Sequence, residues 1–216
     1  MKDYSNFHRN IDLKEKLKRD GTELFNLTLE EGYNSHDIKI DGNEVKAVIY
    51  NKYANKNGSM YYLFTLCNQY KKGSLIEWDN EMWLVLSRPE SNEVYDKAEM
   101  QLCNTSFELE GEITQVLIGN DPRTGKPIYE TTESSPIQLY CVAEKTVFKS
   151  TTDEAINLPE GQILITVPYI EHKSISENEE IELYNATYQI IDVDDTESIN
   201  KTGLRKITAK RVVSNE

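Results

Sequence analysis

The chain has 216 residues, of which 38% are hydrophobic, and a formal net charge of -13 at pH 7. This length allows one large or two small domains with packed cores. The negative charge argues against broad affinity for DNA, RNA or anionic lipid, because phosphate groups are bound by positive surfaces. The first ten residues lack the apolar segment of a secretory signal. No apolar run approaches the roughly 18 residues that a transmembrane helix needs, so no membrane contact is expected.

The most regular helical pattern lies in residues 11 to 31. Leu13 and Leu17 are four residues apart, and Asp12 is placed to cap the first turn. Gly21 is expected to break or bend this helix, because glycine weakens a helix interior.

The same segment differs from the rest of the chain in charge. Five of the 24 basic residues lie between Arg9 and Asp20. A solvated helix face explains such a cluster, and so does an arm that docks on an acidic partner. We therefore define residues 1–33 as an N-terminal helical arm and expect the rest of the chain to be mainly β.

Residues 34–106 are predicted to form a first β module. Asp41 and Gly42 are a turn signal between two runs of alternating polar and apolar residues, which indicates a hairpin. Further strands follow, and the alternating segment at residues 96 to 103 is expected to close the module.

Residues 107–216 are predicted to form a second β module. The segment GNDPRTGK, residues 119–126, is superficially similar to a phosphate-binding loop, but its glycine spacing is wrong and a proline follows its lysine. A hairpin turn explains it better. The alternation in QILITVP predicts a strand that ends at Pro168 or lies at a sheet edge, and GLRKITAKRVV predicts the last strand.

The two modules share one hairpin. The segment GSLIEWDNEMWLVL, residues 73–86, aligns with NEEIELYNATYQII, residues 178–191, at a constant offset of 105 that places Asn80 on Asn185. The closing strands align less well and need a one-residue slip. We interpret the chain as two small β-barrel or sandwich modules in tandem, each containing a similar hairpin, after a short N-terminal helix.

No catalytic, cofactor-binding or metal site is evident in the sequence. None of the histidines has a second ligand at metal-binding spacing, and each is interpreted as a solvated side chain. The scattered cysteines indicate free thiols from a reducing compartment. The residues concerned are His8, His36, His172, Cys67, Cys103 and Cys141. The motifs of common hydrolases are absent from the sequence, so we expect a protein that is not an enzyme and binds no cofactor.

The segment from Glu171 to Asn200 contains nine acidic residues and one lysine. It lacks the glycine and the terminal glutamate that a calcium loop requires at fixed spacing. An acidic, solvated edge that discourages strand aggregation is the favoured interpretation, with a weak surface cation site as the alternative.

One long segment resembles a known class of proteins. The run KKGSLIEWDNEMWLVLSRPESNEVYDKAEMQLCN, residues 71–104, is similar to a segment of minor structural proteins from tailed bacteriophages of Gram-positive hosts. The shared order is a strand after glycine, a hairpin with tryptophan, a polar loop, a tyrosine and an alternating strand that ends in Cys-Asn. The matching positions are Gly73, Trp78, Trp83, Tyr95, Cys103 and Asn104. The segments that follow have a similar order, so the resemblance covers most of the chain from residue 35 onward.

The resemblance implies a virion protein of the phage neck, of the head-closure or head–tail connector type. Such proteins form rings of six or twelve copies, with a portal or adaptor protein above and tail proteins below. Genomic DNA would pass through the lumen without specific binding, which suits an acidic subunit. The implied location is the neck or tail region of the virion, after assembly in the host cytoplasm.

Two other classes of protein remain open. The first is a structural component of the tail or baseplate. The second is a carbohydrate-binding β-sandwich, in which Tyr61, Tyr62 and Tyr184 would form an aromatic platform. Trp78 and Trp83 are expected in a core instead, because they lie in alternating strands.

Overall fold

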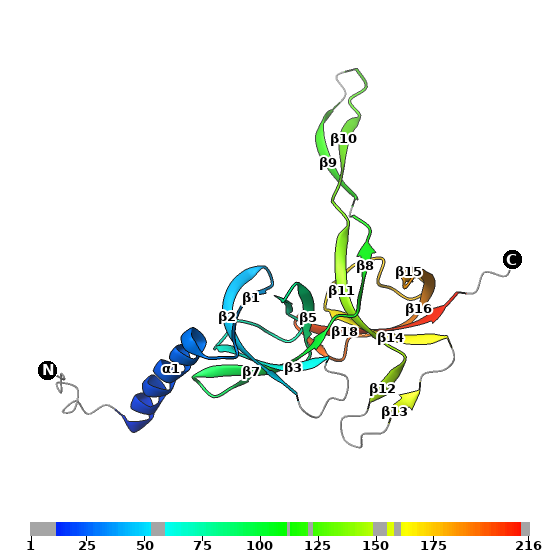
Figure 1. Cartoon of the computed structure of the whole chain (residues 1–216). Helices are drawn as coiled ribbons and strands as arrows, with labels where there is room; N and C mark the ends of the chain where they lie inside the picture. Colours follow the sequence, from blue (N-terminus) through cyan, green and yellow to red (C-terminus); the bar gives the residue numbers. More distant parts are fainter. Residues whose placement is uncertain are drawn as a thin grey trace. The chain divides into compact units, whose positions relative to one another are not determined.

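The computed structural model describes residues 12–52, 59–111, 113–120, 123–148, 155–157 and 161–212. As predicted, the fold is mainly β, with two barrel-like sheets that follow an N-terminal helix (Figure 1). The chain divides into two units, Met1–Leu102 and Cys103–Glu216. Within the described ranges, no helix combines the length and the apolar character needed to cross a membrane.

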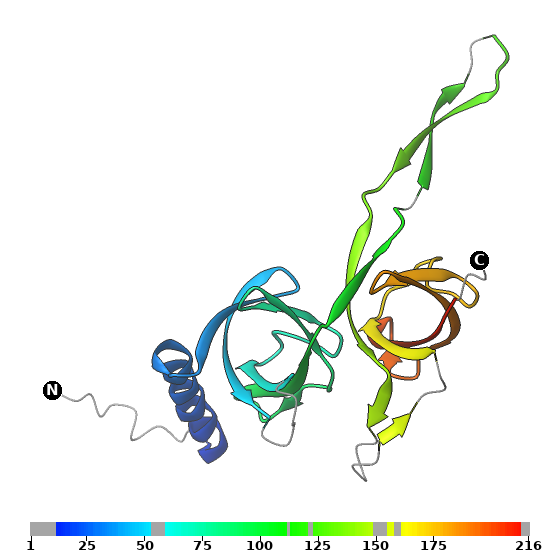
Figure 2. The same ribbon diagram turned by 45° about the vertical axis from the view of Figure 1, so that its right-hand side comes forward.

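Unit 1 is a helix followed by a closed antiparallel barrel. The strand order β3-β2-β1-β4-β5-β7 is closed by pairing of β3 with β7, and β6 pairs with the first part of β7 on the edge that β5 uses further along (Figure 2). The elements are α1 (Leu13–Glu31), β1 (Ser35–Ile40), β2 (Asn43–Asn51), β3 (Met60–Leu66), β4 (Leu75–Trp78), β5 (Glu81–Val85), β6 (Glu90–Ser91) and β7 (Tyr95–Leu102).

The interior of this barrel is filled by alternate side chains of every strand, because successive residues of a strand point to opposite faces. The buried cluster comprises Ile38, Ile40, Ala47, Ile49, Leu63, Tyr70, Ile76, Trp83, Val85, Ala98 and Met100. Both tryptophans therefore contribute to the core of unit 1, as predicted, with Trp78 packed against the cluster from a partly buried position.

The predicted turn at Asp41 and Gly42 also fastens the barrel. Both residues have positive φ angles, 48° and 84°, as a two-residue hairpin turn requires. The Asp41 carboxylate accepts hydrogen bonds from Ser74 Oγ at 2.7 Å and from the Leu75 amide at 2.9 Å. The turn between β1 and β2 is thereby held to the start of β4, the strand that pairs with β1.

Unit 2 contains a second barrel-like sheet, of order β15-β16-β18-β14-β11-β8, in which β8 lies next to β15. Two hairpins, β9–β10 and β12–β13, are separate from this sheet. The elements are β8 (Thr105–Leu109), β9 (Ile113–Asn120), β10 (Pro127–Glu133), β11 (Ile137–Glu144), β12 (Thr146–Phe148), β13 (Ala155–Asn157), β14 (Gln162–Pro168), β15 (Glu180–Leu183), β16 (Ala186–Asp194), β17 (Ser198–Ile199) and β18 (Thr202–Arg211).

The two sheets have the same wiring. Replacing β1, β2, β3, β4, β5 and β7 by β8, β11, β14, β15, β16 and β18 converts the strand order of unit 1 into that of unit 2. The internal repeat therefore extends from one hairpin to the whole six-stranded sheet. The main difference is that β1 and β2 are joined by a two-residue turn, whereas β8 and β11 are joined through the hairpin β9–β10.

The repeated hairpin has the same register in both units. Ile76 pairs with Trp83, and Ile181 pairs with Tyr188 at the equivalent place. All four side chains are buried. The offset of 105 found in the sequence is thus an offset between equivalent core positions.

The turns of these hairpins are also equivalent. Asp79 and Asn80 have φ angles of 54° and 61°, and Tyr184 and Asn185 have φ angles of 51° and 57°. Two consecutive residues with positive φ define the type I′ turn that matches the twist of the flanking strands. Asparagine at the second position tolerates this conformation better than most residues do.

The chain enters both hairpins through the same backbone geometry. Gly73 and Asn178 have positive φ angles of 87° and 73°. Their amides donate hydrogen bonds of 2.9 Å to the carbonyls of Val85 and Ile190, respectively. The equivalence therefore includes the residues that start the hairpin as well as those that form it.

The closing strands differ by more than the expected one-residue slip. Val85 pairs with Met100, 15 residues later, whereas Ile190 pairs with Ala209, 19 residues later. The connection in unit 2 is therefore four residues longer. The paired core residues compensate in size. Val85 faces the larger Met100 in unit 1, whereas Ile190 faces the smaller Ala209 in unit 2.

The sequence predicts that Gly21 breaks or bends the N-terminal helix. A break is contradicted, because α1 runs without interruption from Leu13 to Glu31. A Cβ atom at this position would lie 3.2 Å from Cγ2 of Val94. Glycine therefore allows the helix to approach the loop before β7. The Asp12 side chain accepts a hydrogen bond from the Lys14 amide, which confirms the predicted cap.

Because each unit has its own buried cluster, the two units should respond separately to core mutations. Both tryptophans lie in unit 1, so tryptophan fluorescence reports the unfolding of that unit. Leu63→Ala should destabilise unit 1 by about 2–5 kcal/mol and shift the fluorescence midpoint in urea. Ile165→Ala should shift only the transition of unit 2, followed by far-UV circular dichroism. A fluorescence shift in both variants would contradict separate cores.

The two type I′ turns should respond alike to substitution. Asn80→Val and Asn185→Val should each lower the stability of their unit by about 1–2 kcal/mol, because a β-branched side chain disfavours positive φ. Asn80→Gly and Asn185→Gly are the matched controls and should leave stability close to that of the wild type. Urea denaturation of the four variants makes the comparison, and equal stability of the valine and glycine variants would disprove the argument.

Candidate assembly surfaces

One face of α1 packs on unit 1. Leu29 is buried, and the ring of Phe25 lies 5.1 Å from that of Tyr95, measured between centroids. On the surface, Lys14 forms an ion pair of 2.8 Å with Glu93. This hydrogen bond lowers the pKa of the Glu93 carboxyl group. Aromatic packing and a surface ion pair thus hold the helix against the segment that leads into β7.

Another face of α1 presents four leucines to the surroundings. Leu13, Leu17, Leu24 and Leu27 are 69%, 63%, 67% and 50% exposed. At 100° per residue their positions fall on one side of the helix, away from Phe25 and Leu29. We call this surface the leucine stripe.

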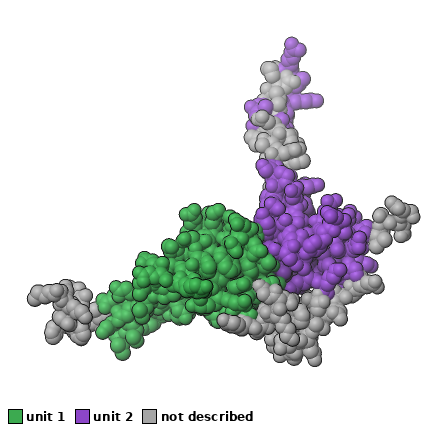
Figure 3. Space-filling view, in the orientation of Figure 1, with its two compact units in different colours: residues 1–102 green, residues 103–216 purple. Residues whose placement is uncertain are grey.

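The hairpin β9–β10 projects from the sheet of unit 2 as a long two-stranded ribbon (Figures 1 and 3). Among the described strands, β9 and β10 pair only with each other. Leu117 and Tyr129 are cross-strand partners and are 55% and 53% exposed, and Ile118 is 60% exposed. The ribbon therefore carries apolar side chains that neither core uses.

The interpretation of GNDPRTGK as a hairpin turn is confirmed. This segment connects β9, which ends at Asn120, with β10, which begins at Pro127. Asp121 and Pro122 lie outside the described residues. Gly125 has a φ of 66°, which suits glycine in a turn.

The aromatic residues of β3 do not form the proposed carbohydrate platform. The ring of Tyr61 lies 5.3 Å from that of Trp78 and 5.2 Å from that of Trp83, as part of the core cluster. Tyr62, the next residue, points to the opposite face, where the Lys97 ammonium lies 4.4 Å from its ring centroid. Tyr184 is 57% exposed at the β15–β16 turn of unit 2.

The interpretation of His172 as a solvated side chain is wrong. It is 9% exposed, its Nδ1 accepts a hydrogen bond from the Ser174 amide at 3.2 Å, and its Nε2 lies 2.9 Å from the Glu110 carbonyl oxygen. The imidazole thus joins two loops of unit 2. His36 lies beside Trp78 at 5.3 Å, and His8 is outside the described residues.

The cysteines are free thiols, as predicted from their spacing. Burial raises the pKa of both Cys103 and Cys141 to about 12. These thiols therefore stay protonated near neutral pH and are poor nucleophiles.

The acidic segment is only partly a solvated edge, because one of its carboxylates forms an ion pair with a buried arginine of unit 2. The Asp195 carboxylate accepts two hydrogen bonds, of 2.6 and 2.8 Å, from the guanidinium of Arg205, which is 7% exposed. The same guanidinium donates to the Ile170 carbonyl at 2.7 Å and lies 4.8 Å from the Tyr169 ring centroid. Within the described ranges, no group of three residues is arranged to hold a metal ion.

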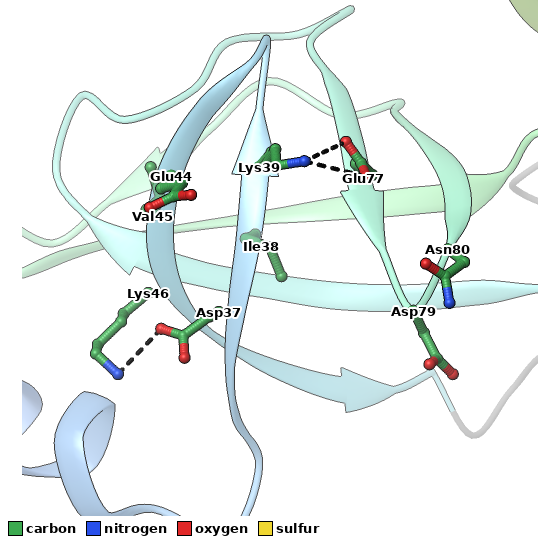
Figure 4. A pocket seen from close by; sticks show the side chains of 9 residues that line it. All are labelled: Asp37, Ile38, Lys39, Glu44, Val45, Lys46, Glu77, Asp79 and Asn80. Carbon is green, nitrogen blue, oxygen red and sulfur yellow. Dashed lines mark hydrogen bonds and ion pairs between the residues drawn. The ribbon is translucent and has the colours of Figure 1, made fainter.

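A shallow depression over β1, β2 and β4 has walls made of paired charges (Figure 4). Lys39 lies 3.1 Å from the Glu77 carboxylate, and Lys46 lies 3.0 Å from that of Asp37. The charges within each of these two pairs neutralise each other, and Glu44 and Asp79 leave the lining with a net charge of -2, which disfavours an anionic ligand. The leucine stripe and the ribbon are therefore the stronger candidates for contacts with other molecules.

Similarity to a solved structure is weak. The complex of K. pneumonia MrkH with c-di-GMP is 10% identical, with coverage of 92% of this chain and 87% of that one, and the TM-score is 0.21. A TM-score this low supports no inference about fold or ligand.

The sequence comparisons are more informative. Residues 6–102 match the model of the YomX N-terminal domain, and residues 104–210 match that of the YomX C-terminal domain. The SPbeta prophage-derived protein YomX of Bacillus subtilis (strain 168) is 35% identical over 214 residues, which cover 99% of this chain and 98% of that protein. These matches support the phage origin implied by the resemblance of residues 71–104. The chain thus belongs to the YomX family, in both of its domains.

Proposed function

We propose that the chain is a structural protein of the phage virion that forms a ring of six or twelve copies in the neck. The ring would lie between a portal or adaptor protein and the tail, and its role would be structural rather than enzymatic. Similarity to a prophage-derived protein supports the phage setting. The observation that carries the proposal is the exposed ribbon β9–β10.

The ribbon favours a neighbour in an assembly. An isolated two-stranded hairpin is marginally stable in water, and this one exposes Leu117, Ile118 and Tyr129. A surface on an adjacent subunit would cover these side chains. Contacts in a cyclic ring are heterologous, so the ribbon would pack against a different surface of the next copy.

Comparison of the two units supports a role for the ribbon outside the fold. Unit 1 makes the equivalent connection with only Asp41 and Gly42. The barrel topology therefore does not require the longer connection between β8 and β11. The added length is available for contacts between subunits.

The charge of the chain is compatible with a DNA channel. A net charge of -13 gives a subunit that repels phosphates on average. Genomic DNA would therefore pass through the ring without specific binding.

Removal of the ribbon should abolish ring formation and preserve the barrels. Residues 111–135 can be replaced by Asn-Gly, a sequence suited to a type I′ turn, which keeps Glu110 and its carbonyl contact with His172. We expect wild-type chains to give six- or twelve-fold species in mass photometry, alone or with the portal protein of the same phage. The shortened chain should remain a smaller species, and the urea transition of unit 2, followed by far-UV circular dichroism, should be unchanged.

A milder variant tests the apolar side chains of the ribbon without removing its backbone. Leu117→Ser combined with Tyr129→Ser keeps the ribbon and removes its apolar pair, and it should weaken ring formation in the same direction. A wild-type chain that stays monomeric with portal present would refute the neck ring and favour a tail or baseplate position. Rings formed equally well by the shortened chain would refute the role of the ribbon.

A further inference from the structure

We propose that the leucine stripe of α1 is a self-complementary surface through which two copies of the chain pair, with their α1 helices antiparallel. The stripe consists of Leu13, Leu17, Leu24 and Leu27, each at least half exposed. This contact is distinct from the ring contact of the ribbon and does not depend on it.

The spacing of the stripe suits a helix partner. Its leucines follow one another at intervals of four, seven and three residues, as in the apolar seam of a coiled coil. Single exposed leucines are common on protein surfaces, but four on one face of one helix, in two pairs separated by Asp20, expose apolar surface that a partner helix can cover. Since Phe25 and Leu29 already attach α1 to unit 1, the stripe is not needed for that attachment.

The charges of α1 are segregated along its length. Residues 13–19 carry a net charge of +3, and residues 20–31 carry a net charge of -4 without any lysine or arginine. The helix macrodipole favours the opposite arrangement, with acidic residues at the start and basic residues at the end. The stability of an isolated α1 therefore does not explain the pattern.

Lys14 and Lys18 pair with Glu93 of the same chain, and antiparallel pairing of two copies accounts for the remaining charges. The basic half of each helix then lies along the acidic half of the other, whereas parallel pairing would bring like charges together. When Leu13 faces the partner subunit's Leu27, Leu17 faces the partner subunit's Leu24, and Glu23 comes beside the partner subunit's Lys16. The contact is the same from both sides, as two-fold symmetry requires.

One residue of the seam is polar. Asp20 lies between Leu17 and Leu24 and would come near the partner subunit's Asp20 at the two-fold axis. Arg19 lies 3.5 Å from the Asp20 carboxylate in the same helix, which offsets part of this like-charge contact. A polar residue within an apolar seam also disfavours other registers.

The pairing and the ring have different symmetries. Neighbours within a ring of six or twelve are related by a rotation of the ring and not by a two-fold axis. The α1 contact would therefore join two free chains, or two rings, rather than neighbours in one ring. Loss of the pairing can thus be distinguished from loss of the ring.

Sedimentation velocity of the full chain at rising micromolar concentration tests the pairing. The wild-type chain should show a reversible doubling of mass, from monomer to dimer or, where rings have formed, from one ring to two. Leu17→Glu combined with Leu24→Glu should weaken the dimer at least about thirtyfold, while circular dichroism shows an unchanged fold. Ile199→Glu is the matched control, because Ile199 is also 69% exposed but lies in unit 2, and it should leave the equilibrium unchanged.

A charge exchange tests the antiparallel orientation. Glu23→Lys and Lys16→Glu should each weaken the dimer, and the two together should restore a dissociation constant close to that of the wild type. A chain that is monomeric at every concentration, or a dimer insensitive to the leucine substitutions, would overturn the pairing. A dimer lost with the leucines but not restored by the charge exchange would overturn the antiparallel arrangement.

Discussion

Closure of a short-stranded sheet is the constraint on which the structure of unit 1 depends. The hairpin β4–β5 pairs with β1 through one strand and with β7 through the other, so it bridges the two parts of the sheet. Its strands are four and five residues long, and the two-residue turn therefore sets the register. A slip of one residue would move Trp83 from the core to the surface.

Both units obey this constraint, and it limits where the two units can differ from each other. Equivalent hairpins and strand orders in the two units preserve the sheet, while paired core residues differ in size, as at Val85 with Met100 and Ile190 with Ala209. The large differences are outside the sheets, in α1 and in the β9–β10 ribbon. Both elements expose several apolar side chains, and on them we base the proposed contacts between copies.

Several polar residues that are plausible site residues in sequence have structural roles. His172 contacts Glu110, 62 residues earlier in the chain, and Arg205 joins Asp195 to the Ile170 carbonyl. Sequence spacing shows none of these partners, because they come from segments that only the folded sheet brings together. The leucine stripe of α1 also depends on tertiary structure. The charge and leucine spacing of α1 are visible in the sequence, but the exposure of the leucines follows from how the helix packs on unit 1.

By itself, the sequence determined the mainly β class, the N-terminal helix with its Asp12 cap, the turn at Asp41, and the offset of 105 between the hairpins. These features depend on alternation and turn preferences within a few residues, so local chemistry is enough to predict them. Only the tertiary structure decided that β3 pairs with β7 to close a barrel, and that the repeat includes six strands. It also decided that Gly21 lies inside the helix, where the absence of a Cβ atom lets Val94 pack closely. These features depend on contacts between distant segments, whose geometry is set by packing and not by local sequence.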